Sequence, residues 1–320
     1  MIVITGGAGF IGSCLLKYLN DRGRDDILIV DNLDTSDKWK NLVGKNFIDY
    51  IPKYDFINFI NEIEESNLIE AIFHLGACSS TTEEDMDYLY DNNYNFSKDL
   101  ASFAIENDVK FIYASSAATY GMGENGFDDN EFNALSPLNG YGFSKYLFDR
   151  WLVRMGLDSV FTGFKFFNVF GPNEYHKESM TSMVYKSYQQ IRSSGKVKLF
   201  ESNDKNIKDG DQKRDFIYVK DICEVMLEAF DKELTGIYNL GTGEANSWNK
   251  LVTNVFKAME KDTHIEYIEM PSQLSKQYQN FTQANMSKFR EAGFVTPFTS
   301  LEDSVKDYVQ NYLKKKNKYL

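Results

Sequence analysis

The segment Ile2-Val-Ile-Thr-Gly-Gly-Ala-Gly-Phe-Ile-Gly12 decides the fold. A short β-branched run leads directly into a turn that contains Gly6, Gly7, Gly9 and Gly12, and an amphipathic segment follows. This order predicts a strand, a glycine turn and a helix. Glycine suits the turn because it adopts backbone angles that a Cβ forbids and lets the chain approach a pyrophosphate closely. The first N–H groups of the helix would bind those phosphates.

The surroundings of this turn indicate a dinucleotide-binding site. The glycines fit the spacing G-x-G-x-x-G, with a strand before them and a helix after them. A second apolar run, residues 27–30, ends at Asp31 about 20 residues further on, where an acidic residue binds a ribose hydroxyl in such sites. A glycine-rich turn without a ligand is the alternative, and the matched context disfavours it.

The remaining segments predict an α/β fold: a Rossmann-type, doubly wound parallel sheet with a smaller mixed α/β substrate lobe. Residues 1–170 are predicted to form the dinucleotide-binding domain, with a return of about 214–243 to its sheet, and residues 171–320 the substrate-binding lobe. The patterns predict further strands near 47 and at 71–76, 110–116 and 160–167, and helices at 55–65, at 85–107 and from 141.

Composition and charge exclude several classes of protein. The chain of 320 residues carries a net charge of −12, so nucleic acid is not an expected partner, because an acidic protein repels phosphate backbones. No apolar run reaches the roughly 18 residues that span a bilayer, and Met1 opens directly onto a strand, so we expect a cytoplasmic protein without a membrane segment. The three cysteines and three histidines lack ligand spacing, so no metal and no disulfide are expected.

Tyr141 and Lys145 are four residues apart on a predicted helix and therefore share one face. A free phenol has a pKa near 10, and a nearby ammonium lowers that pKa, so we expect Lys145 to prepare Tyr141 for acid/base work. Ser116 ends a predicted strand at the same edge of the sheet, where its hydroxyl could donate to a substrate oxygen. A surface pair and a structural serine are the alternatives.

Several phrases together resemble the extended short-chain dehydrogenases/reductases. They are TGGAGFIG at 5–12, Ser116 ahead of YGFSK at 141–145, FFNVFGP at 166–172, RDFIYVKDI at 214–222 and GIYNLGTG at 236–243. Within that superfamily, a second set resembles the ADP-L-glycero-D-manno-heptose 6-epimerases nearly end to end. This set is HLGACSSTT at 74–82, DNNY at 91–94, ASSAATYG at 114–121, HKESM at 176–180, KLFE at 198–201 and QNFTQA at 279–284.

The resemblance implies an isomerase that serves lipopolysaccharide core synthesis. Bound NADP+ takes a hydride from C6 of the heptose, the 6-ketone reorients, and the hydride returns to the opposite face. Two faces imply two acid/base groups, matched by Tyr141 and Lys177. The resemblance also implies homo-oligomers, pentamers among them.

The resemblance further implies cofactor and substrate contacts at matching positions. The cofactor contacts are Gly6, Gly9, Phe10, Ile11, Gly12, Asp31, Asn32, Lys38, Lys53, Leu75, Gly76, Ala77, Cys78, Ser79, Asn92, Lys145, Val169 and Lys177. The substrate contacts are Asn168, Ser179, Lys186, Phe200, Glu201, Ser202, Asn203, Arg214 and Tyr278. Arg214 suits this role because a guanidinium binds a pyrophosphate bidentately.

Several features depart from a simple match. Lys186 stands where relatives often have histidine, Leu75 where a glutamate can occur, and Ser202-Asn203 replaces a glycine-containing pair. Asp31 favours NAD, because a 2′-phosphate beside it meets like charge. Lys38 and Lys53 offset that charge, so we expect NADP, with NAD as the alternative.

Other functions remain open at this stage. A UDP-hexose 4-epimerase shares the dinucleotide site and the Tyr/Lys pair, but the phrases around His176 and Tyr278 argue against it. A 4,6-dehydratase needs an acid/base pair beside the Ser or Thr, and residues 115–119 contain no carboxylate. A plain dehydrogenase would exchange its cofactor with solvent. A non-catalytic NAD(P)-binding sensor would usually lack the Tyr or the Lys, and both are present.

Overall fold

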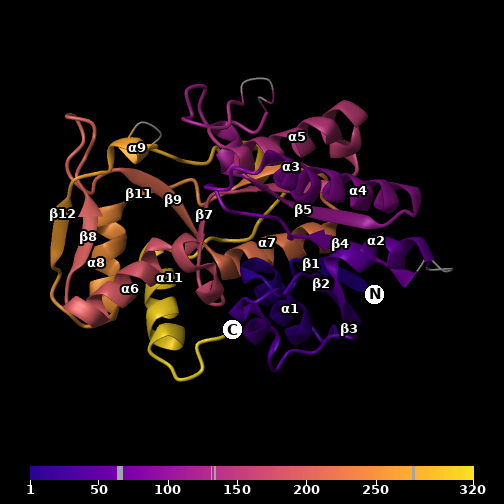
Figure 1. Ribbon diagram of the computed structural model, residues 1–320, viewed down its shortest axis with the longest axis horizontal. Coiled ribbons are helices and arrows are strands. Elements are labelled where there is room, and N and C mark those ends of the chain that lie inside the picture. Colours follow the sequence, from indigo (N-terminus) through magenta and orange to yellow (C-terminus); the bar gives the residue numbers. More distant parts are fainter. Residues whose placement is uncertain (63–67, 131, 133–134, 276–277) are drawn as a thin grey trace.

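The computed structural model describes residues 1–62, 68–130, 132, 135–275 and 278–320. It shows a large layered α/β body that contains the N-terminus and a smaller lobe at its side (Figure 1). The predicted α/β class is confirmed.

A seven-stranded sheet forms the centre of the large body, and every neighbouring pair in it is parallel. Its order across the sheet is β10 (Gly236–Leu240), β6 (Thr162–Phe166), β5 (Lys110–Ser116), β4 (Ala71–His74), β1 (Ile2–Thr5), β2 (Ile27–Asp31) and β3 (Asp49–Pro52). The chain reverses its direction of winding between β1 and β4. Ligands of such sheets bind at this switch point, outside the carboxyl ends of the strands.

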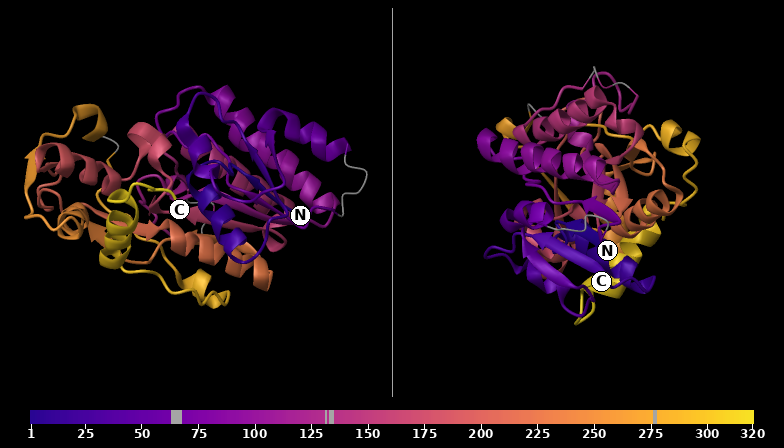
Figure 2. Two further views of the ribbon diagram at one scale, coloured as in Figure 1. Left: turned by 90° about the horizontal axis from the view of Figure 1, so that it is seen from below. Right: turned by 90° about the vertical axis from the view of Figure 1, so that its right-hand side faces the viewer.

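Helices cover both faces of this sheet because side chains alternate along each strand. Ile2 and Ile4 share a core cluster with residues of α1 (Phe10–Asp21) and α7 (Val219–Lys232), and these two helices pack against each other. Val3 belongs to the cluster on the other face, with α2 (Lys53–Glu62), α4 (Phe96–Glu106) and α5 (Gly140–Met155). Figure 2 shows the sheet between these two layers.

The predicted helix over 85–107 is interrupted. It consists of α3 (Met86–Leu89), a π-helical segment η3 (Tyr90–Asn95) and α4. The wider turn accompanies a buried Asn93, whose side chain accepts a hydrogen bond from the Cys78 backbone N–H at 2.8 Å and donates to the Cys78 carbonyl at 2.9 Å. Such π segments occur often at functional sites, and this one fixes the loop that follows β4.

The smaller lobe contains two further sheets. β7 (Asn168–Phe170) pairs with β9 (Lys213–Tyr218), which pairs with β11 (Ala245–Ser247), and β8 (Val197–Phe200) pairs with β12 (Ile265–Ile268). The segment 214–243 was predicted to return to the large sheet. Its strand β10 does lie in that sheet, but its strand β9 lies in the three-stranded sheet instead. The helices of this lobe are α6 (Met183–Ser194), α8 (Trp248–Ala258), α9 (Ser272–Ser275) and α11 (Leu301–Asp307), whereas α10 (Ser287–Glu291) contacts β10 of the large sheet.

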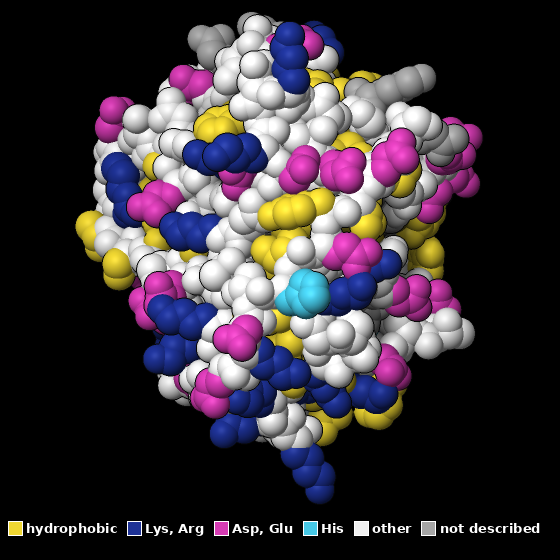
Figure 3. Space-filling model, turned by 90° about the vertical axis from the view of Figure 1, so that its left-hand side faces the viewer, with side chains coloured by type: hydrophobic (Ala, Val, Ile, Leu, Met, Phe, Trp, Pro, Cys, Tyr) yellow, Lys and Arg dark blue, Asp and Glu magenta, His cyan; other side chains and the backbone are white. Residues whose placement is uncertain are grey.

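Figure 3 shows the outer face of this lobe, with Lys and Arg side chains gathered in its lower half. The acidic excess of the chain is therefore not concentrated there. Among the described residues, none of the helices combines the length and apolar character needed to cross a bilayer. No group of His, Cys, Asp or Glu in that part of the chain could hold a metal ion, and Cys14, Cys78 and Cys223 are free thiols.

Candidate active site

A cavity of about 940 Å³ lies at the carboxyl ends of β1, β2, β4, β5 and β6, between the large body and the smaller lobe. Its walls come from the glycine turn, the loop after β4, the start of α5, and the segment from β7 to α6. This location and size suit a dinucleotide together with a sugar.

The glycine turn has the shape that a pyrophosphate requires. Gly6 has a φ of +67°, and a Cβ on it would lie 2.6 Å from the backbone nitrogen of Gly76. A Cβ on Gly12 would lie 2.3 Å from the carbonyl oxygen of Gly6. Gly9 is the N-cap of α1 and provides no capping side chain, so the first N–H groups of that helix remain open to an anion. These residues fit a dinucleotide.

Asp31 lies at the far end of this cradle, at the end of β2. Its carboxylate accepts hydrogen bonds from the backbone N–H of Ala8 at 2.9 Å and of Asn32 at 2.7 Å, and from Lys38 Nζ at 2.6 Å. Lys38 therefore neutralises Asp31 directly. Lys53 instead donates to the side chain of Asn92, so only one of the two predicted lysines pairs with the carboxylate.

Tyr141, Lys145 and Ser116 meet at the other side of the cavity. The Asn139 side chain caps the start of α5 by accepting a hydrogen bond from the backbone N–H of Gly142 at 2.8 Å. The helix packs against β5, whose last residue is Ser116. Lys145 is buried, and its Nζ donates to the carbonyl oxygen of Ala114 at 2.7 Å. All three side chains line the cavity.

The pKa values here correct one expectation. Burial raises the pKa of Tyr141, while the hydrogen bond with Ser116 acts in the opposite direction. The net direction is therefore opposite to the lowering that was expected from Lys145. Burial also lowers the pKa of Lys145, to about 8.

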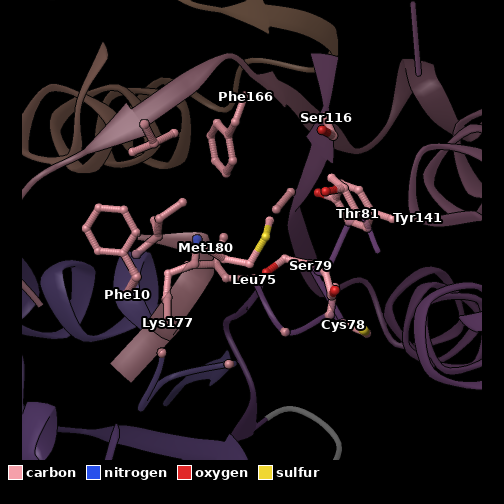
Figure 4. A pocket seen from close by; sticks show the side chains of 18 of the residues that line it. Phe10, Leu75, Cys78, Ser79, Thr81, Ser116, Tyr141, Phe166, Lys177 and Met180 are labelled. Carbon is pink, nitrogen blue, oxygen red and sulfur yellow. The ribbon is translucent and has the colours of Figure 1, made fainter. Parts of the chain in front are cut away.

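Lys177 lies on the opposite wall. Its Nζ is 5.5 Å from the centroid of the Phe10 ring, and burial lowers the pKa of this ammonium, while the charge of Glu174 raises it. The next residue, Glu178, has a φ of +47° and a ψ of −114°, an unusual conformation for a residue with a Cβ. Figure 4 shows Lys177 and Phe10 on one side of the cavity and Tyr141 and Ser116 on the other.

A buried arginine lies behind Trp248, which forms part of the cavity wall. Arg214 is only 7% exposed, and its guanidinium lies 5.6 Å from the centroid of the Trp248 ring and 5.1 Å from that of the Tyr278 ring. Trp248 lines the cavity and donates from Nε1 to the Tyr278 hydroxyl at 2.9 Å. Burial lowers the pKa of Arg214, and no ion pair involves it among the described residues. A buried cation without a carboxylate suits an anionic ligand.

The comparison with family models decides the assignment: residues 2–241 match the model described as "NAD dependent epimerase/dehydratase family". The chain belongs to this family. A curated relative from Nitratidesulfovibrio vulgaris, named ADP-L-glycero-D-manno-heptose-6-epimerase, is 49% identical over 98% of each chain. One of the same name from Fusobacterium nucleatum is 46% identical over the whole of both chains.

A solved structure agrees with these epimerase relatives. The crystal structure of the Helicobacter pylori ADP-L-glycero-D-manno-heptose-6-epimerase is 30% identical, with a TM-score of 0.81, over 97% of this chain and 95% of the other. The resemblance noted in the sequence is confirmed along the full length of the chain.

The structure brings most of the predicted epimerase site together. Every predicted cofactor contact lines the cavity, as do Tyr141, Ser116, Asn168 and Lys186. Ser179 does not line the cavity; its backbone carbonyl oxygen instead accepts a hydrogen bond from Lys186 Nζ at 2.6 Å. The remaining predicted substrate contacts lie outside the lining, behind Trp248 or at the end of β8: Phe200, Glu201, Ser202, Asn203, Arg214 and Tyr278.

Several lining residues were missed from the sequence, among them Trp248, Met180, Phe166 and Thr81. Met180 ends the HKESM phrase that drew attention to Lys177, so that phrase carried a signal for it. No signal in the sequence pointed to Trp248, because a single aromatic residue at the start of a helix is usually interpreted as part of the core.

Proposed function

We propose that this chain inverts C6 of ADP-D-glycero-β-D-manno-heptose to the L-glycero form through a transient 6-ketone, for lipopolysaccharide core synthesis. The full-length relatives of that name support the substrate class. The single observation that carries the mechanism is the position of Tyr141 and Lys177 on opposite sides of one cavity (Figure 4).

Two facing groups suit an inversion. When bound, a nicotinamide dinucleotide supplies the hydride acceptor and donor, and it ends the cycle unchanged. The C6 oxygen must lose and regain a proton in two orientations of the sugar, so one acid/base group is needed on each side. Tyr141 serves one orientation and Lys177 the other, while Ser116 donates a hydrogen bond to the oxygen as its charge changes.

The proposed cofactor is NADP, one in each subunit. The glycine turn and α1 hold the pyrophosphate, Lys145 holds the nicotinamide ribose, and Asp31 with Lys38 faces the adenosine ribose. Support for the 2′-phosphate comes from the Lys38–Asp31 hydrogen bond, because a neutralised carboxylate repels that phosphate less. NAD remains the alternative.

The substrate's ADP group is proposed to bind in the smaller lobe. Support comes from the buried guanidinium of Arg214, which lies near two aromatic rings and has no carboxylate partner among the described residues. Asn168 and Lys186, which line the cavity, are placed by this proposal at the heptose. We also propose a homo-oligomer, with a pentamer among the expected forms, on the family resemblance alone. Light scattering on the purified protein measures its oligomeric state.

The test is incubation of the purified protein with ADP-D-glycero-β-D-manno-heptose, followed by NMR of the product. We expect inversion at C6 without added cofactor, and release of NADP when the protein is denatured. Inversion of a UDP-hexose instead would move the assignment to a 4-epimerase. Cofactor binding without any turnover would favour the non-catalytic sensor.

A further inference from the structure

A charged pair that the proposed reaction does not use lies beneath the Tyr141 corner. Asp149 on α5 and Lys165 on β6 form an ion pair, and both side chains are 0% exposed. Removing two charges from water is costly, and a buried ion pair often contributes no more stability than apolar side chains of the same volume. Fold stability alone therefore does not account for it.

The hydrogen bonds of this pair connect it to two strands and a helix. The Asp149 carboxylate accepts from the hydroxyls of Tyr113, at 2.9 Å, and Ser115, at 2.7 Å. Lys165 Nζ donates to the Thr119 hydroxyl at 2.9 Å. That hydroxyl in turn donates to the carbonyl oxygen of Ser116, also at 2.9 Å. Both charges are thus satisfied by groups next to the proposed site.

The pair lies close to both halves of the proposed acid/base corner. Asp149 is one helical turn after Lys145 on α5, so the two side chains share a face of that helix. Ser115, which donates to Asp149, directly precedes Ser116, and it lies opposite Lys165 in the register of β5 and β6. The pair therefore couples the turn of α5 that carries Lys145 to the strand end that carries Ser116.

We propose that Asp149 and Lys165 are positioning residues: they hold α5 in register with the end of β5 and place a fixed negative charge behind the Lys145 ammonium. This inference rests on the proposed function for its kinetic readout only. Asp149 touches neither substrate nor cofactor in this account, and it acts through Lys145 and Tyr141.

Electrostatics support the same arrangement. Burial lowers the pKa of Lys145, and the Asp149 charge raises it in compensation. The Asp149 charge also raises the pKa of Tyr141. The other titratable groups around this corner include Tyr113 on β5, Lys165 on β6, Cys78 after β4, His74 on β4 and Lys53 on α2. Tyr120 belongs to them too: its ring lies 5.5 Å from Lys165 Nζ, and burial and then nearby carboxylates, Asp149 among them, raise its pKa. Burial lowers the pKa of His74, and the Lys145 and Lys53 charges lower it further.

The direct test measures the titration of Lys145 by NMR of the labelled lysine side chains, with Lys145→Arg assigning the signal. The variant Asp149→Asn/Lys165→Gln removes both charges while keeping groups that can form hydrogen bonds. We expect the pKa of Lys145 to fall in this variant, because the Asp149 charge that raises it is removed. A Lys145 midpoint equal to that of the wild type would overturn the inference, whatever the enzyme's activity.

Kinetics give a second readout. Because the Asp149 charge raises both pKa values, we expect the whole pH profile of kcat to move to lower pH in the double variant, with little change in KM. The charge-retaining Asp149→Glu should keep the profile of the wild type. The exposed pair Lys196–Glu266, changed to Gln/Gln, is the matched control and should leave the profile unchanged.

A purely structural role would lower the melting temperature and the amount of active protein while leaving the pH profile in place, and that result counts against the inference. Should the double variant fold poorly, Asp149→Asn alone removes the charge that raises the Lys145 pKa and gives the same readout. An inactive wild type would count against the proposed function instead, and the NMR titration would still decide this inference.

Discussion

Lys38 Nζ donates a hydrogen bond to Oδ1 of Asp31 at 2.6 Å. Asp31 is the last residue of β2, and Lys38 follows it seven residues later in the chain. The acidic residue that normally selects NAD is therefore already paired with a cation. The pairing reduces the electrostatic repulsion that a 2′-phosphate would meet at this end of the cavity. Removal of Lys38 therefore tests the cofactor preference directly.

Lys38→Ala should weaken NADP binding selectively. A charge-assisted hydrogen bond contributes roughly 1.5–3 kcal/mol, so we expect about 10- to 100-fold weaker binding of NADP and little loss for NAD. Calorimetry on cofactor-depleted protein measures both. Lys40→Ala, which removes an exposed lysine paired with Asp37, is the control. Equal losses for the two cofactors would contradict the NADP assignment.

Tyr141→Phe should fold, bind cofactor as before and lose turnover by about 10²- to 10⁴-fold, because positioned proton transfer contributes that much. Product NMR over time measures the rate. Tyr146→Phe, on the same helix, is the control and should keep normal turnover. Unchanged turnover in Tyr141→Phe would remove this phenol from the chemistry.

Lys177→Met should also lower turnover by about 10²-fold or more, since it removes the proton-transfer group from the opposite wall. Burial lowers the pKa of Lys177, so its neutral form becomes available at lower pH than for a free lysine. Turnover measured against pH in the wild type and the variant tests this role. Lys196→Met controls for the loss of one positive charge, and a full rate in Lys177→Met would exclude the two-base scheme.

Arg214→Lys should raise KM by about 10-fold or more with a smaller change in kcat. Lysine keeps the charge but loses the planar guanidinium that lies near Trp248 and Tyr278 and that can bind a diphosphate bidentately. Calorimetry with ADP gives an independent measure of the affinity. The control is Lys213→Ala, a change at the exposed neighbouring residue, and this variant should bind ADP with normal affinity. Normal affinity for ADP in Arg214→Lys would mean that the diphosphate binds elsewhere.

Glu228→Gln should reduce stability in a pH-dependent way. Burial alone would raise the pKa of Glu228, but hydrogen bonds from Lys232, Thr296 and Val295 lower it from 4.5 to about 2. The folded value lies below the unfolded one, so the stabilisation is fully present above about pH 4.5 and is lost as the pH falls towards 2.

Urea unfolding measures the effect of Glu228→Gln. The difference from the wild type should be largest near pH 7 and shrink towards pH 3. Asp231→Asn, an exposed change on the same helix, should show a much smaller difference at neutral pH. A difference that does not vary with pH would contradict the role of the carboxylate charge.

Local spacing predicted much of the fold and half of the site. The glycine turn, Asp31 and the Tyr141/Lys145 pair were identified because their chemistry depends on residues close together in the chain. The helix over 85–107 was predicted without its π segment, since the buried Asn93 that accompanies it bonds to Cys78 in another loop. The direction of the Tyr141 pKa was wrong because burial is not encoded in a four-residue spacing.

The sequence by itself determined the dinucleotide turn, the order of strands and helices, and the family, because these follow from periodicity, from the backbone freedom of glycine and from whole phrases of residues. The packing of the elements decided that Lys177 faces Tyr141 across the cavity, that Lys38 rather than Lys53 pairs with Asp31, and that Asp149 and Lys165 meet beneath the site. Each of these three relationships joins separate elements of the fold. Their distances are set by how the elements pack, so no spacing along the chain could have given them.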